Sequence, residues 1–115
     1  YAILDWGPHP TPEMIDMLLD VIVAETNFTC IQTYGVLHNL NYTFASAQQR
    51  GLKVIAVIWL QPNETAINNQ SIQIGIDMAH RYNDTIIAIS CGSELRVRYS
   101  KEVATPLIVD CIQQV

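Results

Sequence analysis

The sequence lacks any long apolar segment, since the longest uninterrupted apolar run covers only residues 54–60 of the 115-residue chain. A helix that crosses a bilayer needs about 20 apolar residues in a row, so we expect no membrane span. Basic residues are also scarce, with 6 Lys and Arg against 11 Asp and Glu, which gives a net charge of −5. Because nucleic acids and anionic membranes are bound by clusters of Lys and Arg, we expect neither as a partner.

The common motifs for cofactors, metals and serine hydrolases are missing as well. There is no GxGxxG, GxxxxGK[ST] or GxSxG segment, and the histidines and cysteines show neither HExxH nor CxxC spacing. We therefore expect no cofactor and no metal ion. Cys30, Cys91 and Cys111 are expected to be buried free thiols, as free cysteines usually are, although an oxidising compartment would allow an intermolecular disulfide.

Glycosylation signals, by contrast, are abundant. Five Asn-x-Ser/Thr triplets occur, where chance alone would give about one in a chain of this composition. Their asparagines are Asn27, Asn41, Asn63, Asn69 and Asn83. The triplets predict a glycoprotein of the eukaryotic secretory pathway that is secreted or associated with a cell wall, with coincidence in an Asn- and Thr-rich chain as the alternative.

Half of the residues are apolar and only 15% are charged, which is typical of one folded domain spanning residues 1–115. Strand-like runs begin near residues 2, 29, 53 and 85. Segments of helical period follow each run: from Thr11 and Pro12 onward, over residues 36–50 and 63–82, and from about Thr105 to the end. The continuous Val and Ile run at residues 54–58 is typical of a parallel strand that is buried on both faces.

The chain thus reads as four strand–helix units of about 29 residues, close to the roughly 31 residues per unit of a (β/α)₈ barrel. The predicted fold class is α/β: a (β/α)₄ half of a TIM-type barrel with a parallel sheet. A four-stranded open sheet with helices on both faces is the competing architecture. The periodicity alone does not separate the two.

Polar and aromatic side chains follow the predicted strands, at the edge where parallel α/β folds carry their sites. They are Asp5, Trp6, Gln32, Tyr34, Trp59, Ser93 and Glu94. Aromatic rings and amides suit a sugar, and a carboxyl group beside a Trp can have the raised pKa that a general acid requires. Glu94 is the main catalytic candidate, although it could also be a solvated partner of Arg96 or Arg98. Asp5 is either catalytic or a cap of the following turn.

Three segments resemble the family 17 glycoside hydrolases, the β-1,3-glucanases and glucan-remodelling enzymes of plants and fungi. The segments are residues 30–35 (CIQTYG), 51–60 (GLKVIAVIWL) and 84–95 (DTIIAISCGSEL). The family motifs read roughly I-R-T-Y-G, G-L-K-V-x-x-G-I-W-L and V-x-x-V-G-N-E, in the same order.

The resemblance implies that Glu94 is the general acid/base at the end of the fourth strand. It also implies that Tyr34 and Trp59 lie near the sugar. Gln32 stands where the family has Arg, and Ser93 stands where it has Asn. The family nucleophile is a Glu on the seventh strand, for which the sequence offers no match.

Half a barrel would leave two sheet edges and an apolar inner face open, and such edges invite pairing with another chain. We expect a homodimer in which two halves complete one eight-stranded barrel. In that assembly Asp5 of one copy would approach Glu94 of the other, since neighbouring strands lie about 4.8 Å apart.

Three functions stay open. The first is a weak or residual hydrolase of β-glucosidic bonds, such as those of β-1,3-glucan, with Glu94 as acid/base. The second is a non-catalytic carbohydrate-binding protein that lacks the nucleophile. The third is a structural or scaffold protein derived from such an enzyme.

Overall fold

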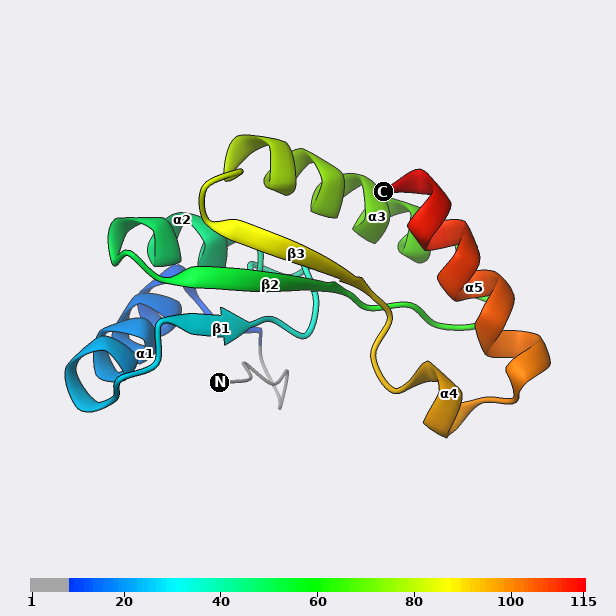
Figure 1. Ribbon diagram of the computed structural model, residues 1–115, viewed down its shortest axis with the longest axis horizontal. Coiled ribbons are helices and arrows are strands. Elements are labelled where there is room, and N and C mark those ends of the chain that lie inside the picture. The colour runs from blue at the N-terminus through cyan, green and yellow to red at the C-terminus, as the bar shows by residue number, and fades with distance from the viewer. Residues whose placement is uncertain (1–8) are drawn as a thin grey trace.

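The computed structural model describes residues 9–115, in which helices and strands alternate (Figure 1). The elements are α1 (Pro12–Glu25), β1 (Cys30–Gln32), α2 (Tyr42–Gln49), β2 (Lys53–Ile58), α3 (Thr65–Arg81), β3 (Ile86–Cys91), α4 (Leu95–Arg98) and α5 (Lys101–Gln114). The strands form one parallel sheet in the order β1-β2-β3. A mixed α/β fold with a parallel sheet is therefore confirmed for these residues, whereas the predicted first strand at residues 1–4 lies outside them.

Helix α1 begins where the sequence predicts. The Thr11 hydroxyl accepts a hydrogen bond from the Met14 backbone N–H at 3.2 Å, and Pro12 is the first helical residue. Pro suits this position because a backbone N–H in the first turn has no acceptor within the helix, so its absence costs no hydrogen bond. Helix α3 also agrees closely with its predicted range.

Helix α2 is shorter than predicted, since it begins at Tyr42 and not at residue 36. Residues 36–41 form bends and turns instead, and both His38 and Asn39 have positive φ angles of 55° and 68°. An L-residue in a right-handed helix needs a negative φ, so the predicted helix cannot extend through His38 and Asn39.

The last helix was also predicted wrongly. It begins at Lys101, four residues before the predicted start, and Pro106 lies inside it. Pro106 cannot donate the usual backbone hydrogen bond, which makes it an unusual interior residue. Packing outweighs this loss, because Ala104 and Cys111 are fully buried and a disulfide joins Cys111 to Cys91 of β3. The one-turn helix α4 was not predicted.

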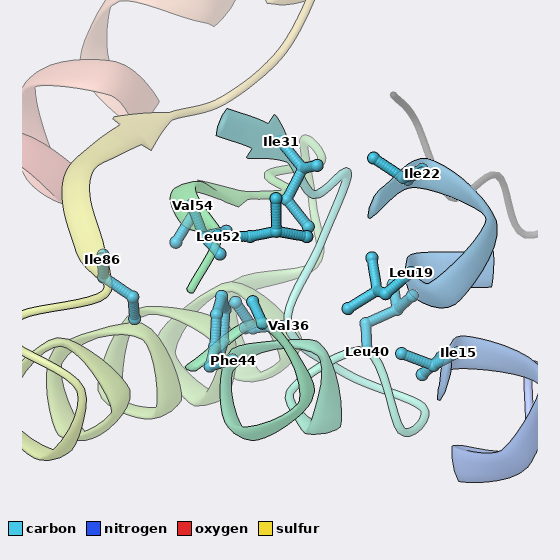
Figure 2. Packing of buried hydrophobic residues seen from close by; sticks show 12 residues of the cluster. Ile15, Leu19, Ile22, Ile31, Val36, Leu40, Phe44, Leu52, Val54 and Ile86 are labelled. Carbon is cyan, nitrogen blue, oxygen red and sulfur yellow. The ribbon is translucent and has the colours of Figure 1, made fainter. Parts of the chain in front are cut away.

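The hydrophobic core lies between the helices and one face of the sheet. On that face, Val54, Ala56 and Ile58 of β2 point toward the helices and are fully buried. Figure 2 shows the larger cluster, in which side chains from α1 and α2, among them Leu19 and Phe44, converge on this face. Fully burying a side chain of this size contributes roughly 1.5–3 kcal/mol.

A second core cluster continues along the same face. It joins Ile58 and the adjacent Leu60 to Ile72 of α3 and to Ala104 and Cys111 of α5. Helices α1, α2, α3 and α5 therefore all pack on the same side of the sheet within residues 9–115.

The opposite face of the sheet is less covered by the described residues. Lys53, Ile55 and Val57 point to it from β2, and their neighbours in register include Gln32 and Ala88. Ala88 is exposed and Ile55 and Gln32 are half-buried, although Val57 is buried. The strand predicted to be buried on both faces is thus fully packed on its helix side only.

A polar network ties α1 to α2 at the surface. The carboxylate of Asp16 accepts hydrogen bonds from Ser46 at 2.5 Å and Tyr42 at 3.0 Å, and it pairs with Arg50 at 3.2 Å. The bond from Ser46 is the main reason that the pKa of Asp16 lies below its usual value of 3.8. Hydrogen bonding to Asp16 raises the pKa of Tyr42.

Candidate functional site

Three of the predicted site residues lie together at the carboxyl edge of the sheet. Because the strands are parallel, they all end at this edge: Tyr34 follows β1 by two residues, Trp59 directly follows β2, and Glu94 follows β3 by three. All three line one cavity of about 670 Å³. Ligand-binding cavities usually measure about 300–1,000 Å³, and this one falls within that range.

One wall of the cavity comes from the turn segment after β1. Val36 and Leu40 are buried there and add apolar surface, and His38 adds a polar ring. This wall exists because residues 36–41 do not continue into α2. Residues 36–41 were expected to be helical, and they were therefore not predicted to line a site.

Helix α3 supplies polar groups to the cavity and fixes the segment after Trp59. The side chain of Asn68 is buried, and its Oδ1 accepts a hydrogen bond from the Gln61 backbone N–H at 3.0 Å. Its Nδ2 donates to the Gln61 carbonyl oxygen at 2.7 Å. Buried polar groups need such partners, so Asn68 holds the exit of β2 in one conformation.

The turn that carries Glu94 has an unusual backbone. Gly92 has a φ of +81°, and a Cβ added there would lie 2.5 Å from Leu95 Cδ1. Glu94 itself is in the left-handed region, with φ 57° and ψ 14°. The left-handed conformation is energetically unfavourable for any residue that has a Cβ atom. Backbone strain of this kind is concentrated at functional sites. The strain at Glu94 therefore suggests a functional role, as it would for His38, Asn39 and Asn63, which also have positive φ angles within residues 9–115.

Arg98 of α4 lies between Glu94 and Trp59. Its Nε and Nη2 donate to Glu94 Oε2 at 3.3 and 3.2 Å, and its Cζ lies 5.0 Å from the centroid of the Trp59 ring. The Arg98 guanidinium therefore lies over the Trp59 ring and also pairs with the carboxylate of Glu94. The expectation that Glu94 could pair with Arg98 is confirmed.

Gln32 and Ser93 are not part of this cavity lining. Gln32 lies within β1, half-buried on the face opposite the helices, and Ser93 is half-buried beside Glu94. Asp5 and Trp6 lie outside the described residues. Sequence reasoning missed His38 and Asn68, which no motif marks.

The cysteines differ from the expectation of buried free thiols. Cys91 of β3 and Cys111 of α5 form a disulfide, and Cys30 is a free thiol that is exposed. Cys91 and Cys111 lie on different elements, and they meet because α5 packs against the sheet. The pairing could not be read from a separation of 20 residues.

All five asparagines of the glycosylation triplets are exposed. They lie on loops, at a helix start and on the outer side of α3, and none of them lines the cavity. A glycan on any of them would thus have room at the surface.

Within residues 9–115, no group of three or more His, Cys, Asp and Glu side chains is arranged to hold a metal ion. His9 and His38 stack face to face with ring centroids 3.8 Å apart. In the same part of the chain, no helix combines the length and the hydropathy that crossing a membrane requires.

Comparisons of the chain with protein-family models, with curated proteins and with solved structures find no match. The likeness to family 17 glycoside hydrolases therefore depends on the three sequence segments alone.

Proposed function

We propose that this chain is a glycoside-hydrolase-like half-barrel that acts on β-1,3-glucan in the cavity at the carboxyl edge of its sheet. One observation carries the proposal: Tyr34, Trp59 and Glu94, each from a different strand end, line the same cavity. These are the positions to which the family 17 resemblance assigns sugar contacts and the acid/base. Aromatic rings stack on the apolar faces of sugars, and polar groups such as the exposed side chain of Gln61 pair with their hydroxyls.

Glu94 is the proposed general acid/base, and the reaction needs a second carboxyl group. In retaining glycosidases the two carboxyl groups are about 5–5.5 Å apart. Among the described residues that line the cavity, Glu94 is the only Asp or Glu. The nucleophile would therefore come from another part of the protein or from a second copy, with Asp5 as the candidate. We expect slow hydrolysis from this chain alone.

The half-barrel architecture is part of the proposal. It is supported by the packing of α1, α2, α3 and α5 on a single face of the sheet. Open parallel sheets usually carry helices on both faces, whereas a (β/α)₈ barrel carries them only outside. We propose that a second copy covers the inner face as a homodimer. Light scattering should then give twice the 12.9 kDa mass of the chain, and a stable monomer would contradict dimer closure.

Carbohydrate binding without hydrolysis is the second candidate. It is favoured by the ion pair that engages Glu94 with Arg98, and by the lack of a second carboxylate among the described residues that line the cavity. A binding protein needs the aromatic and amide groups but no nucleophile.

Two assays on the same variants separate these functions. Release of reducing ends from soluble β-1,3-glucan measures hydrolysis, and calorimetry with a β-1,3-linked glucotetraose measures binding. A hydrolase loses turnover but keeps binding in Glu94→Gln. A binding protein shows no turnover and loses affinity in Trp59→Ala and Tyr34→Ala. The matched control is Tyr99→Ala, since Tyr99 is exposed and does not line the cavity. If the protein shows neither turnover nor binding, a role in β-1,3-glucan metabolism is refuted.

We further propose that the protein passes through a secretory pathway and is secreted or associated with a cell wall. The five exposed triplet asparagines support this, as does the Cys91–Cys111 disulfide, because disulfides persist in oxidising compartments. After expression in a eukaryotic secretory host, glycosidase treatment should reduce the mass of the protein. An unchanged mass would contradict glycosylation.

A further inference from the structure

Arg98 touches both groups on which the proposed function depends. Its guanidinium lies over the Trp59 ring at 5.0 Å and donates two hydrogen bonds to Glu94 Oε2. Arg98 also lines the cavity itself. A single side chain thus occupies the aromatic surface and the carboxylate at the same time.

A sugar needs the same surface of Trp59 that Arg98 covers. Trp59 is half-buried, which leaves limited ring area open to the cavity. Both a guanidinium and the C–H groups of a pyranose ring prefer the face of an aromatic ring. The two cannot stack on the same face at once, so binding of a sugar on this face requires Arg98 to leave it.

We propose that Arg98 covers the ring face of Trp59 to which a sugar would bind, and that a bound glucan displaces it. This inference rests on the proposed β-1,3-glucan function and adds a second step to it. Because the same guanidinium holds Glu94, displacement from Trp59 also frees the carboxylate. A sugar stacked on Trp59 therefore increases the fraction of molecules in which Glu94 is unpaired.

The contacts of Arg98 are weak enough to be displaced. The side chains of Arg98 and Glu94 are 49% and 58% exposed, and they form an i,i+4 pair on the four-residue helix α4. Ion pairs at this exposure contribute little because water and salt compete with them. A cation–π contact at a partly exposed site changes an equilibrium by roughly two- to five-fold. Competition from Arg98 should therefore weaken glucan binding by about that factor.

Calorimetry with a β-1,3-linked glucotetraose tests the inference on the full chain. Arg98→Met removes the charge but keeps a long side chain, and it should bind the tetraose roughly two- to five-fold more tightly than the wild type. The matched control is Arg96→Met, because Arg96 is exposed on the same short helix and does not line the cavity. The control should bind as the wild type does.

The outcomes distinguish this inference from the proposed function. Equal or weaker binding by Arg98→Met, with clear binding by the wild type, overturns the role of Arg98 and leaves the glucan function standing. Binding by the variant alone supports the role of Arg98. No binding by either protein overturns the glucan function, and the inference falls with it.

A second measurement needs no sugar. In a Trp6→Phe background Trp59 is the only tryptophan, and acrylamide quenching then reports how open its ring is. Arg98→Met should raise the quenching constant, whereas Arg96→Met should not. An unchanged constant in Arg98→Met overturns the covering contact. If Arg98→Met does not give a cooperative thermal transition, Arg98→Gln takes its place in both measurements.

Discussion

The left-handed backbone at Glu94 leads to a prediction that reverses the usual order of two substitutions. Glu94 has a φ of 57° and a ψ of 14°. Alanine is normally the better residue in folded backbone, and glycine the worse one. At this position we expect Glu94→Gly to be more stable than Glu94→Ala.

The magnitude follows from two opposing effects. The left-handed conformation costs a residue with a Cβ roughly 1–2 kcal/mol. Glycine avoids that cost but gives the unfolded chain more freedom, which disfavours folding by about 0.4–1 kcal/mol. Both variants lose the same ion pair with Arg98, so the pair cancels in the comparison. The glycine variant should be the more stable by about 1 kcal/mol.

Urea unfolding with equal m-values measures this difference directly, and thermal unfolding should show a gap of about 4 °C. Arg96 provides the control, since glycine there should be less stable than alanine by up to about 1 kcal/mol. A Glu94→Ala variant at least as stable as Glu94→Gly would refute the reasoning. Glu94 would then not be held in a costly conformation, and the inference from strain to function would fail.

Three further predictions concern the framework around the cavity. Gly92→Ala should destabilise the protein by about 2 kcal/mol in urea unfolding, because the added Cβ would lie 2.5 Å from a leucine side chain at a φ of +81°. Replacing Cys91 and Cys111 by Ser should cost about 3 kcal/mol, the loop-entropy value for a separation of 20 residues. The lowered pKa of Asp16 stabilises the fold above pH 3.8, and this contribution should disappear as the pH falls further, so Asp16→Asn should unfold with a shallower acid dependence.

Each of these predictions has a control in the same protein. Gly51 has a φ of +68° but nothing within 4 Å of an added Cβ, so Gly51→Ala should cost less than Gly92→Ala. Cys30→Ser should leave stability unchanged, because this thiol is exposed and unpaired. Gln48→Asn, at an exposed position on α2 that carries no ionisable group, should keep the wild-type acid dependence. Equal effects in a variant and its control would contradict the corresponding prediction.

The parts of the fold that follow from local sequence were predictable. The strands β2 and β3 follow from their Val and Ile runs, and the start of α1 follows from the Thr11 cap and Pro12. These signals involve only a few neighbouring residues, so they can be recognised in the sequence. The positions of Tyr34, Trp59 and Glu94 at one edge then follow from the parallel order of the strands, because parallel strands end on the same side.

The parts that depend on distant contacts were not predictable. Pro106 lies inside α5 because the helix is held by burial of Ala104 and by the bond to Cys91, neither of which the local pattern reveals. The positive φ angles of His38 and Asn39 were not predictable, because neither residue is a glycine. The spacing of Arg98 from Glu94 did suggest a pair, but nothing in the sequence places Arg98 over the ring of Trp59.

The most direct test of the account is an NMR titration of the ¹⁵N-labelled protein with a β-1,3-linked glucotetraose. We predict saturable shifts of the Trp59 indole and of the backbone amides of Tyr34 and of residues 92–98. Amides of α1, none of whose residues lines the cavity, should move least. Shifts confined to other regions, or no shifts at millimolar tetraose, would contradict the claim that the cavity at the strand ends is a glucan site.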